Sequence, residues 1–352
     1  MLIHLFISPF VATTFFHDSN LTKYISLASV VVLLSVLYNT LLGVERGLKH
    51  FKLYALLEFL KQFFLLCVGV FFVLYLGYGI KGALLALILS PALLLIVYFF
   101  RHHKLLAPGR IEYKGMLATG FTLGIIGFVL ALFMSLDEFI VGFLQSKTQV
   151  GLYAASISVM NIGFYFVSGI KNTLFPFLTE KYTQVGDVHN KEFLRYFNRV
   201  NILTLIAVGY FLIGAMIFRQ ELILLIFGQK YLASAQLLSI VLFALPFLSL
   251  YILLHTFALS TNRIREVLTS STITLLPSAG VIYFLTKSYG VVGTAYGLVI
   301  CSFILFLSYY FFILRGIRAQ LSSLFFLILV IFLFGIAARY FSGGLLRNIL
   351  VF

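Results

Sequence analysis

The chain has 352 residues, of which 62% are apolar and only 10% are charged, and its mean hydropathy is +1.09. A soluble domain carries about 45–50% apolar and about 25% charged residues, so this composition excludes a soluble globular protein and predicts an integral membrane protein. We attribute the net charge of +14 mostly to membrane topology and anionic lipid, and we expect no nucleic-acid binding.

Apolar runs recur along the chain, and several are long enough to cross a hydrocarbon layer about 30 Å thick as a helix. The period-two alternation of membrane strands is absent, so the predicted fold class is an all-α polytopic membrane protein. The first run is short, and without a basic segment or cleavage site it is not expected to be a signal peptide. The sequence predicts eleven spans, near residues 2–16, 24–44, 53–76, 80–100, 116–144, 150–171, 200–218, 235–258, 267–286, 291–314 and 321–341.

Basic residues are concentrated in alternate loops. Lys and Arg number sixteen on one side and eight on the other, and basic loops remain in the cytoplasm. We therefore predict a cytoplasmic N-terminus. The longest of these loops, 172–199, is too short for an extramembrane domain. The loops predicted to be cytoplasmic are 45–52, 101–114, 171–199, 263–266 and 315–320.

The chain also contains an internal match. The stretch "YGIKGALLALIL" at 78–89 resembles "YGVVGTAYGLVI" at 289–300, and each opens a helix. The offset of 211 residues corresponds to an even number of spans, so the two units would keep the same orientation. A parallel repeat of about six helices is an architecture of secondary transporters. The alternative is a chance match, because glycine-rich helix starts are common in membrane proteins.

Two further stretches, "DEFIVGFLQSKTQVGLYAASISVMNIGFYFVSGIKNTLFPFLTEKY" and "ELILLIFGQKYLASAQLLSIVLFALPF", carry a family resemblance. They resemble the second half of the polysaccharide-export and O-antigen flippases, in the multidrug/oligosaccharidyl-lipid/polysaccharide exporter superfamily. Members have fourteen helices in two six-helix lobes plus two. The resemblance implies that this chain begins within the third helix and stops near the start of the fourteenth. The lobes would be 1–110, incomplete, and 111–320, with an additional helix and stub at 321–352.

The resemblance implies a non-enzymatic transporter that flips a polyprenyl-pyrophosphate-linked oligosaccharide across the bacterial inner membrane by alternating access. No cofactor is implied, and coupling to H⁺ or Na⁺ is left open. The expected partners are the lipid-linked substrate, membrane lipids and possible polysaccharide assembly proteins. One alternative is a multidrug or organic-cation antiporter of the same superfamily. The other is a membrane glycan polymerase or ligase, although P-loop, GxSxG, HExxH and Asp-rich metal motifs are all absent from the sequence.

Two adjacent acids, Asp137 and Glu138, lie near the outer end of the run that begins at Met116. A carboxylate at the end of a membrane span costs little free energy, and Glu138 fits the interpretation as such a residue. Six apolar residues follow, however, which would leave Asp137 about two turns inside a tilted helix. Because ionisable groups within a span are candidates for function, Asp137 is a cavity candidate.

The span at 150–171 carries a polar stripe at helical spacing, which lines either a wet cavity or a helix–helix seam. Lys171 lies beside its cytoplasmic end and is either a cavity residue or a topology anchor. The residues of the stripe are Ser158, Asn161, Tyr165, Ser168 and Asn172.

Charged residues in the predicted first lobe and at the cytoplasmic turns complete the candidates. Glu58 and Lys61 are spaced to pair on one helix face, either as a silent couple or as a charged lobe wall. Arg46 and Arg263 lie at matching basic turns and would capture a phosphate head group, or else anchor topology.

The remaining polar residues in apolar runs have structural interpretations. His4 and His255 are expected to be hydrogen-bonded histidines of the bundle. Cys67 and Cys301 give neither a disulfide pattern nor a metal-site spacing.

Overall fold

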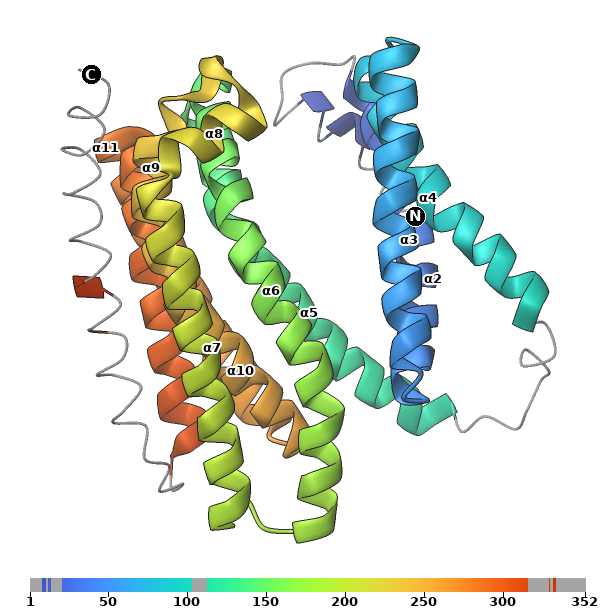
Figure 1. Ribbon diagram of the computed structural model, residues 1–352, viewed down its shortest axis with the longest axis vertical. Coiled ribbons are helices and arrows are strands. Elements are labelled where there is room, and N and C mark those ends of the chain that lie inside the picture. The colour runs from blue at the N-terminus through green and yellow to red at the C-terminus, as the bar shows by residue number, and fades with distance from the viewer. Residues whose placement is uncertain are drawn as a thin grey trace, which may run out of the picture. The chain divides into compact units, whose positions relative to one another are not determined.

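The computed structural model describes residues 8–10, 12–13, 21–102, 113–315, 329 and 332–333. The regular elements within these ranges are all helical (Figure 1). Eight of the described helical runs are long and apolar enough to cross a membrane, which confirms the all-α membrane fold class. The spans predicted at 2–16 and 321–341 fall mostly outside the described residues. Two compact units are present, Met1–Glu112 and Tyr113–Phe352.

Unit 1 contains the helices α2 (Leu21–Gly47), α3 (Phe51–Val70) and α4 (Gly79–His102). A π-helical turn, Phe71–Tyr75, extends α3 before the chain reverses at two positive-φ glycines. α4 packs on both α2 and α3. Their common core is small, and it consists of Tyr38, Leu41, Leu42, Leu57 and Leu94.

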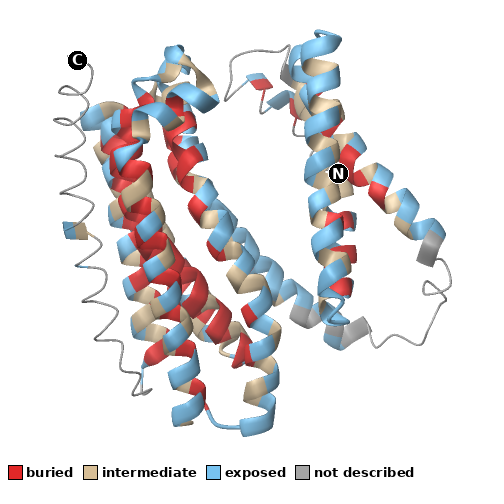
Figure 2. Cartoon of the chain, in the orientation of Figure 1, coloured by how far each residue is buried: buried red, intermediate tan, exposed pale blue. Residues whose placement is uncertain are grey.

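Unit 2 has a buried central span. The segment Ser234–Ser260 is helical almost throughout, and 94% of its most apolar window is buried. Figure 2 shows the buried residues gathered along the inner faces of this unit. The elements of the unit are α5 (Tyr113–Leu144), α6 (Lys147–Val185), α7 (Lys191–Ile217), α8 (Arg219–Phe227), the 3₁₀ turns Gln229–Tyr231 and Leu242–Ala244, α9 (Ser234–Val241), α10 (Leu245–Ser260) and α11 (Ile264–Leu314).

The 51-residue run α11 is a hairpin of two helices. Its backbone leaves the helical region at Gly290, where φ is 60° and ψ is −146°. The Thr286 and Thr294 hydroxyls are 2.9 Å apart, and those of Ser271 and Tyr309 are 2.6 Å apart. Both pairs lie nearly symmetrically about Gly290, so the two arms run antiparallel. The spans predicted on either side of this glycine are therefore both present.

The segment 172–199, predicted to be a long loop, is mostly helical, and its cytoplasmic location stays a prediction. α6 continues as a helix to Val185, and α7 already begins at Lys191. Gly186 adopts φ 68° at the end of α6, and the Asn190 side chain accepts hydrogen bonds at the start of α7. The polar pair Lys171 and Asn172 interrupts the apolar pattern without ending α6, which buries Leu174 and Leu178 beyond this pair.

The two stretches of the internal match share a positive-φ glycine at the same position. Gly79 and Gly290, which occupy the same position in the match, have φ values of 52° and 60°. Three residues later, a Cβ at Gly82 would lie 2.9 Å from the Phe72 carbonyl oxygen, and a Cβ at Gly293 would overlap the Leu285 carbonyl oxygen. In both units the new helix therefore begins pressed against the backbone of the helix that precedes it.

The turns that precede these helix pairs also correspond. Lys49 and Asn262 are the two non-glycine residues with positive φ in the described chain, both at 59°. Each is followed by a residue at the N-cap of the next helix, His50 before α3 and Arg263 before α11. The two basic turns thus match, but the counterpart of Arg263 is His50 and not Arg46. Superposition of the three helices in each unit stays a prediction.

Candidate functional site

Asp137 is a buried carboxylate between helices of unit 2. α5 presents it toward α6, where the Tyr153 hydroxyl donates a hydrogen bond to Asp137 Oδ2 at 2.5 Å. The two side chains are only 4% and 1% exposed, whereas the neighbouring Glu138 is exposed. A turn of about 100° per residue along the helix separates the two acids in this way. Asp137 is thus the acid that faces the protein interior.

α11 contacts other polar groups in this part of unit 2. Gln145, at the end of α5, donates from Nε2 to the Thr286 carbonyl oxygen at 3.4 Å. The Cys301 thiol lies close enough to Asp137 to interact with its charge, and it contacts the Ser278 carbonyl oxygen. The Ser278 hydroxyl is buried without a hydrogen-bond partner. Tyr153 of α6 therefore holds the buried acid by a hydrogen bond, and Cys301 of α11 lies within reach of its charge.

The polar stripe of α6 lies outside the core of unit 2. Ser158 and Tyr165 are exposed, and Asn161, Ser168 and Asn172 are half-buried. The hydroxyls of Ser158 and Ser168 donate to carbonyl oxygens of their own helix, at 2.8 and 3.0 Å. The stripe is accessible from outside the unit, which suits both a wet cavity wall and a seam with another helix.

Lys171 and His255 adjoin a buried hydroxyl cluster. His255 Nδ1 lies 3.4 Å from the Tyr309 hydroxyl, which also contacts Ser271 Oγ. Tyr251 packs edge-on against Tyr309, with ring centroids 4.8 Å apart. Half-buried Lys171 lies near enough to His255 to act on it electrostatically. His255 is a hydrogen-bonded histidine of the bundle, as predicted.

In unit 1, two cations lie on aromatic rings. The Lys61 ammonium is 5.0 Å from the centroid of the Tyr38 ring, so its described contact is with this ring and not with Glu58. Tyr38 is 1% exposed, and its hydroxyl has no hydrogen-bond partner. Arg46 lies 5.4 Å over the Tyr54 ring. These contacts hold both cations at the surface of the unit.

Glu45 is a buried acid that was not predicted from the sequence. This residue is 1% exposed and accepts a short hydrogen bond from the Tyr98 hydroxyl, while His50 Nδ1 lies 2.9 Å from its other oxygen. The contact joins the end of α2 to α4 and to the start of α3. The sequence signal for Glu45 is its position: it follows the apolar part of a span directly and precedes a basic turn.

Arg263 makes a structural contact. Its Nη1 donates to the Ile313 carbonyl oxygen at 2.7 Å, which ties the start of α11 to its end. A cation at the carboxyl end of a helix also complements the helix dipole. No group of three or more His, Cys, Asp or Glu in the described ranges is arranged to hold a metal ion.

The helical arrangement is similar to that of several solved transporters. A MOP superfamily transporter from Pyrococcus furiosus matches with a TM-score of 0.67 and 16% identity, covering 92% of this chain and 76% of that one. The MATE transporter VcmN of Vibrio cholerae, in its bent form, gives 0.63 and 14%, over 91% and 76%. An inward-facing multidrug resistance MATE transporter gives 0.69 and 16%, over 92% and 78%.

The family model for polysaccharide biosynthesis proteins matches residues 1–236. The chain therefore belongs to this family, with the fold of the MOP superfamily. No curated protein matches it. The protein is a multi-pass membrane protein of the polysaccharide biosynthesis family, and the family resemblance inferred from its sequence is confirmed.

Proposed function

We propose that the protein translocates a polyprenyl-pyrophosphate-linked oligosaccharide across the bacterial inner membrane by alternating access. The observation that carries this proposal is the match to polysaccharide biosynthesis proteins on a chain with a MOP transporter fold. An oligosaccharide and a pyrophosphate are costly to move through hydrocarbon, whereas the polyprenyl tail can remain in lipid. The protein must then supply a polar path for the head group only.

The accessible polar groups supply such a path. The α6 stripe offers hydroxyl and amide groups to the sugars. Lys171 of the same helix offers charge-assisted hydrogen bonds to phosphate. Within unit 1, taken by itself, Arg46 and Lys61 offer the same chemistry. Arg263 takes a lesser part, because one of its guanidinium nitrogens already holds a helix end.

Asp137 has a different role in this scheme. It is buried on a neutral hydroxyl, so it carries a proton or receives a cation as the cavity changes its access, and coupling to H⁺ or Na⁺ would act here. The same buried acid favours a second candidate, antiport of organic cations, which requires carboxylates in the cavity. The two candidate functions differ in which charges they require. The flippase requires the Lys and Arg cations, whereas the antiporter requires only the carboxylate of Asp137.

The proposed orientation places the N-terminus and the α6–α7 turn in the cytoplasm. In a Cys67→Ser, Cys301→Ser background, Ser146→Cys and Lys287→Cys should react with an impermeant thiol reagent added outside intact cells. Thr183→Cys should react only after permeabilisation. All three positions are exposed in the structure. The reverse labelling pattern would refute the orientation.

The function is tested by glycan export in a strain that lacks its own flippase. We expect the full chain to restore export, and loss of export when Lys61 and Lys171 are both replaced by Gln at normal membrane abundance. Resistance to organic cations without glycan export would instead support the antiporter.

A further inference from the structure

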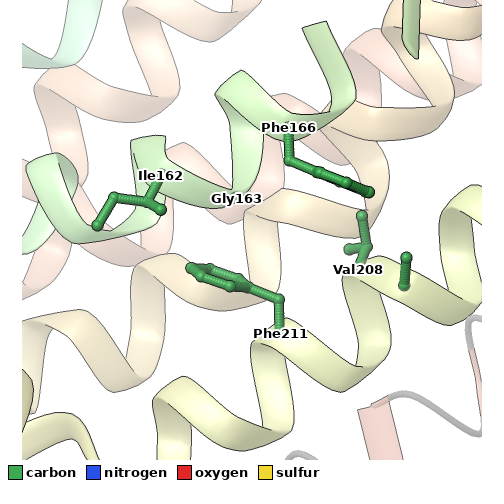
Figure 3. Close-up of a pocket in the computed structure, with 6 residues that line it drawn as sticks. Ile162, Gly163, Phe166, Val208 and Phe211 are labelled. Atoms are coloured by element: carbon green, nitrogen blue, oxygen red, sulfur yellow. The ribbon is translucent and has the colours of Figure 1, made fainter. Parts of the chain in front are cut away.

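An apolar cavity lies between α6 and α7 in unit 2, and it opens at the surface of the unit, where Ile162 and Phe166 are more than half exposed. Its volume is about 320 Å³, and Ile162, Gly163 and Phe166 of α6 form one wall. Figure 3 shows Val208 and Phe211 of α7 reaching into the space from the other side. The remaining lining residue is Ala207.

Gly163 shapes the floor of this cavity. A Cβ at this position would lie 2.7 Å from Phe211 Cδ1 and 2.6 Å from Leu245 Cδ2, so only glycine allows the Phe211 ring to lie this close to α6. The lining carries no polar side chain. Cavities lined by apolar side chains stay dry and take apolar ligands.

The place of the cavity in the helices limits its occupant. It lies near the middle of α6 and of α7, both of which have the length and hydropathy of membrane spans. A ligand at this depth comes from the hydrocarbon layer. Tyr165 of the polar stripe and Phe166 of the cavity are consecutive, so the stripe and the cavity occupy adjacent faces of α6 at the same depth.

We infer that this cavity binds the polyprenyl chain of the lipid-linked substrate while its head group contacts the α6 stripe. The inference rests on the proposed function. A ligand that is polar at one end and hydrocarbon at the other matches a helix with a polar face beside an apolar cavity. The bulk of a methyl-branched chain also suits a space bounded by two phenyl rings and a glycine. Tail binding here would hold the substrate beside the polar path.

The test is photolabelling of the full chain in lipid nanodiscs. The probe is a short-chain polyprenyl phosphate with a diazirine on its terminal isoprene unit, and the labelled peptides are mapped by mass spectrometry. Label is expected on the segments around Ile162–Phe166 and Ala207–Phe211. Ala207→Phe fills the cavity and should abolish that label. Ile206→Phe, whose side chain is 39% exposed outside the lining, is the matched control and should keep it.

A second probe, phosphatidylglycerol with a diazirine on its acyl chain, separates the two sources of hydrocarbon. Equal labelling of the cavity by both probes would overturn the inference, as would undiminished label in Ala207→Phe or absence of label in the wild-type chain. Phe166→Ala keeps the cavity open and should retain label, which guards against a folding defect in the filled variant. Transport is measured in parallel. Specific label without transport would refute the function alone, and transport without label would refute this inference alone.

Discussion

The two units place different chemistry at corresponding positions. Counted from the matched residues Lys49 and Asn262, Glu58 of unit 1 corresponds to Ser271 of unit 2, and nearby Lys61 corresponds to a threonine. The unit 1 pair is half-buried and charged, whereas Ser271 is 1% exposed and neutral. One backbone arrangement therefore supports a charged surface in one unit and a sealed core in the other.

Two tyrosines at matched positions also have different partners in the two units. Tyr98 and Tyr309 each lie nineteen residues after a positive-φ glycine of the match. Tyr98 donates to the buried acid Glu45, and Tyr309 contacts Ser271 and His255. Backbone turns thus define the repeat, while the side chains have diverged. The buried acid of unit 2, Asp137, lies on α5, outside the matched helices.

The largest expected effect concerns the turn that both units share. Gly293→Ala would place a Cβ into the Leu285 carbonyl oxygen, so we expect about 3 kcal/mol of destabilisation or more and little folded protein. Gly82→Ala, with its contact at 2.9 Å, should cost less. Size-exclusion chromatography with a thermal ramp measures both. Gly280→Ala, where nothing lies within 4 Å, is the control. Equal stability of Gly293→Ala and the control would contradict the shared turn geometry.

The second-largest effect is expected at Asp137, which lies outside the helices that match between the two units. Asp137→Asn should abolish transport at normal membrane abundance, because a proton or cation can no longer be exchanged, and Asp137→Glu should retain part of it. Glu138→Gln, on the exposed face, should be nearly silent. Glycan export in the flippase-deficient strain is the readout. Equal tolerance of Asp137→Asn and Glu138→Gln would make both acids ordinary helix-end residues.

A moderate effect is expected from making unit 1 resemble unit 2. Lys61→Thr gives this position the residue found at Thr274, and removing one charge-assisted hydrogen bond should raise the half-saturating substrate concentration roughly tenfold. Lys52→Thr, at the exposed start of α3, is the matched control and should change little. Initial transport rates in proteoliposomes give the comparison. An unchanged concentration dependence in Lys61→Thr would remove this cation from the substrate path.

The smallest effect concerns the two left-handed turn residues. Asparagine tolerates φ near 59°, but lysine does so at a cost of about 1 kcal/mol. Lys49→Gly should therefore raise the free energy of unfolding by up to about 1 kcal/mol, whereas Asn262→Gly should be close to neutral. Thermal melts in detergent would detect the difference. Stabilisation of Asn262→Gly alone would contradict the assigned strain.

Much of the fold could be predicted from the sequence, because each span is a long apolar run and lipid allows only helices there. The hairpin at Gly290 and the match to Gly79 followed from a short glycine-rich pattern. The helical extension of α6 to Val185 did not, because Lys171 and Asn172 interrupt the apolar run and Pro176 suggests a helix end. Glu45 was missed because its partner Tyr98 is 53 residues away. Burial of Asp137 was predicted only as one alternative, because helical phase does not identify the neighbouring helix.

Reconstitution of the full chain in proteoliposomes tests whether the protein flips a lipid-linked oligosaccharide. A polyprenyl-pyrophosphate oligosaccharide with a fluorescent sugar is placed in both leaflets, and an impermeant reductant added outside quenches the exposed fraction. Flipping by alternating access predicts rapid quenching of the protected fraction with the wild-type chain, and only the slow leak of empty liposomes with Asp137→Asn. Protection that persists with the wild-type chain, while the same vesicles exchange an organic cation for protons, would contradict it.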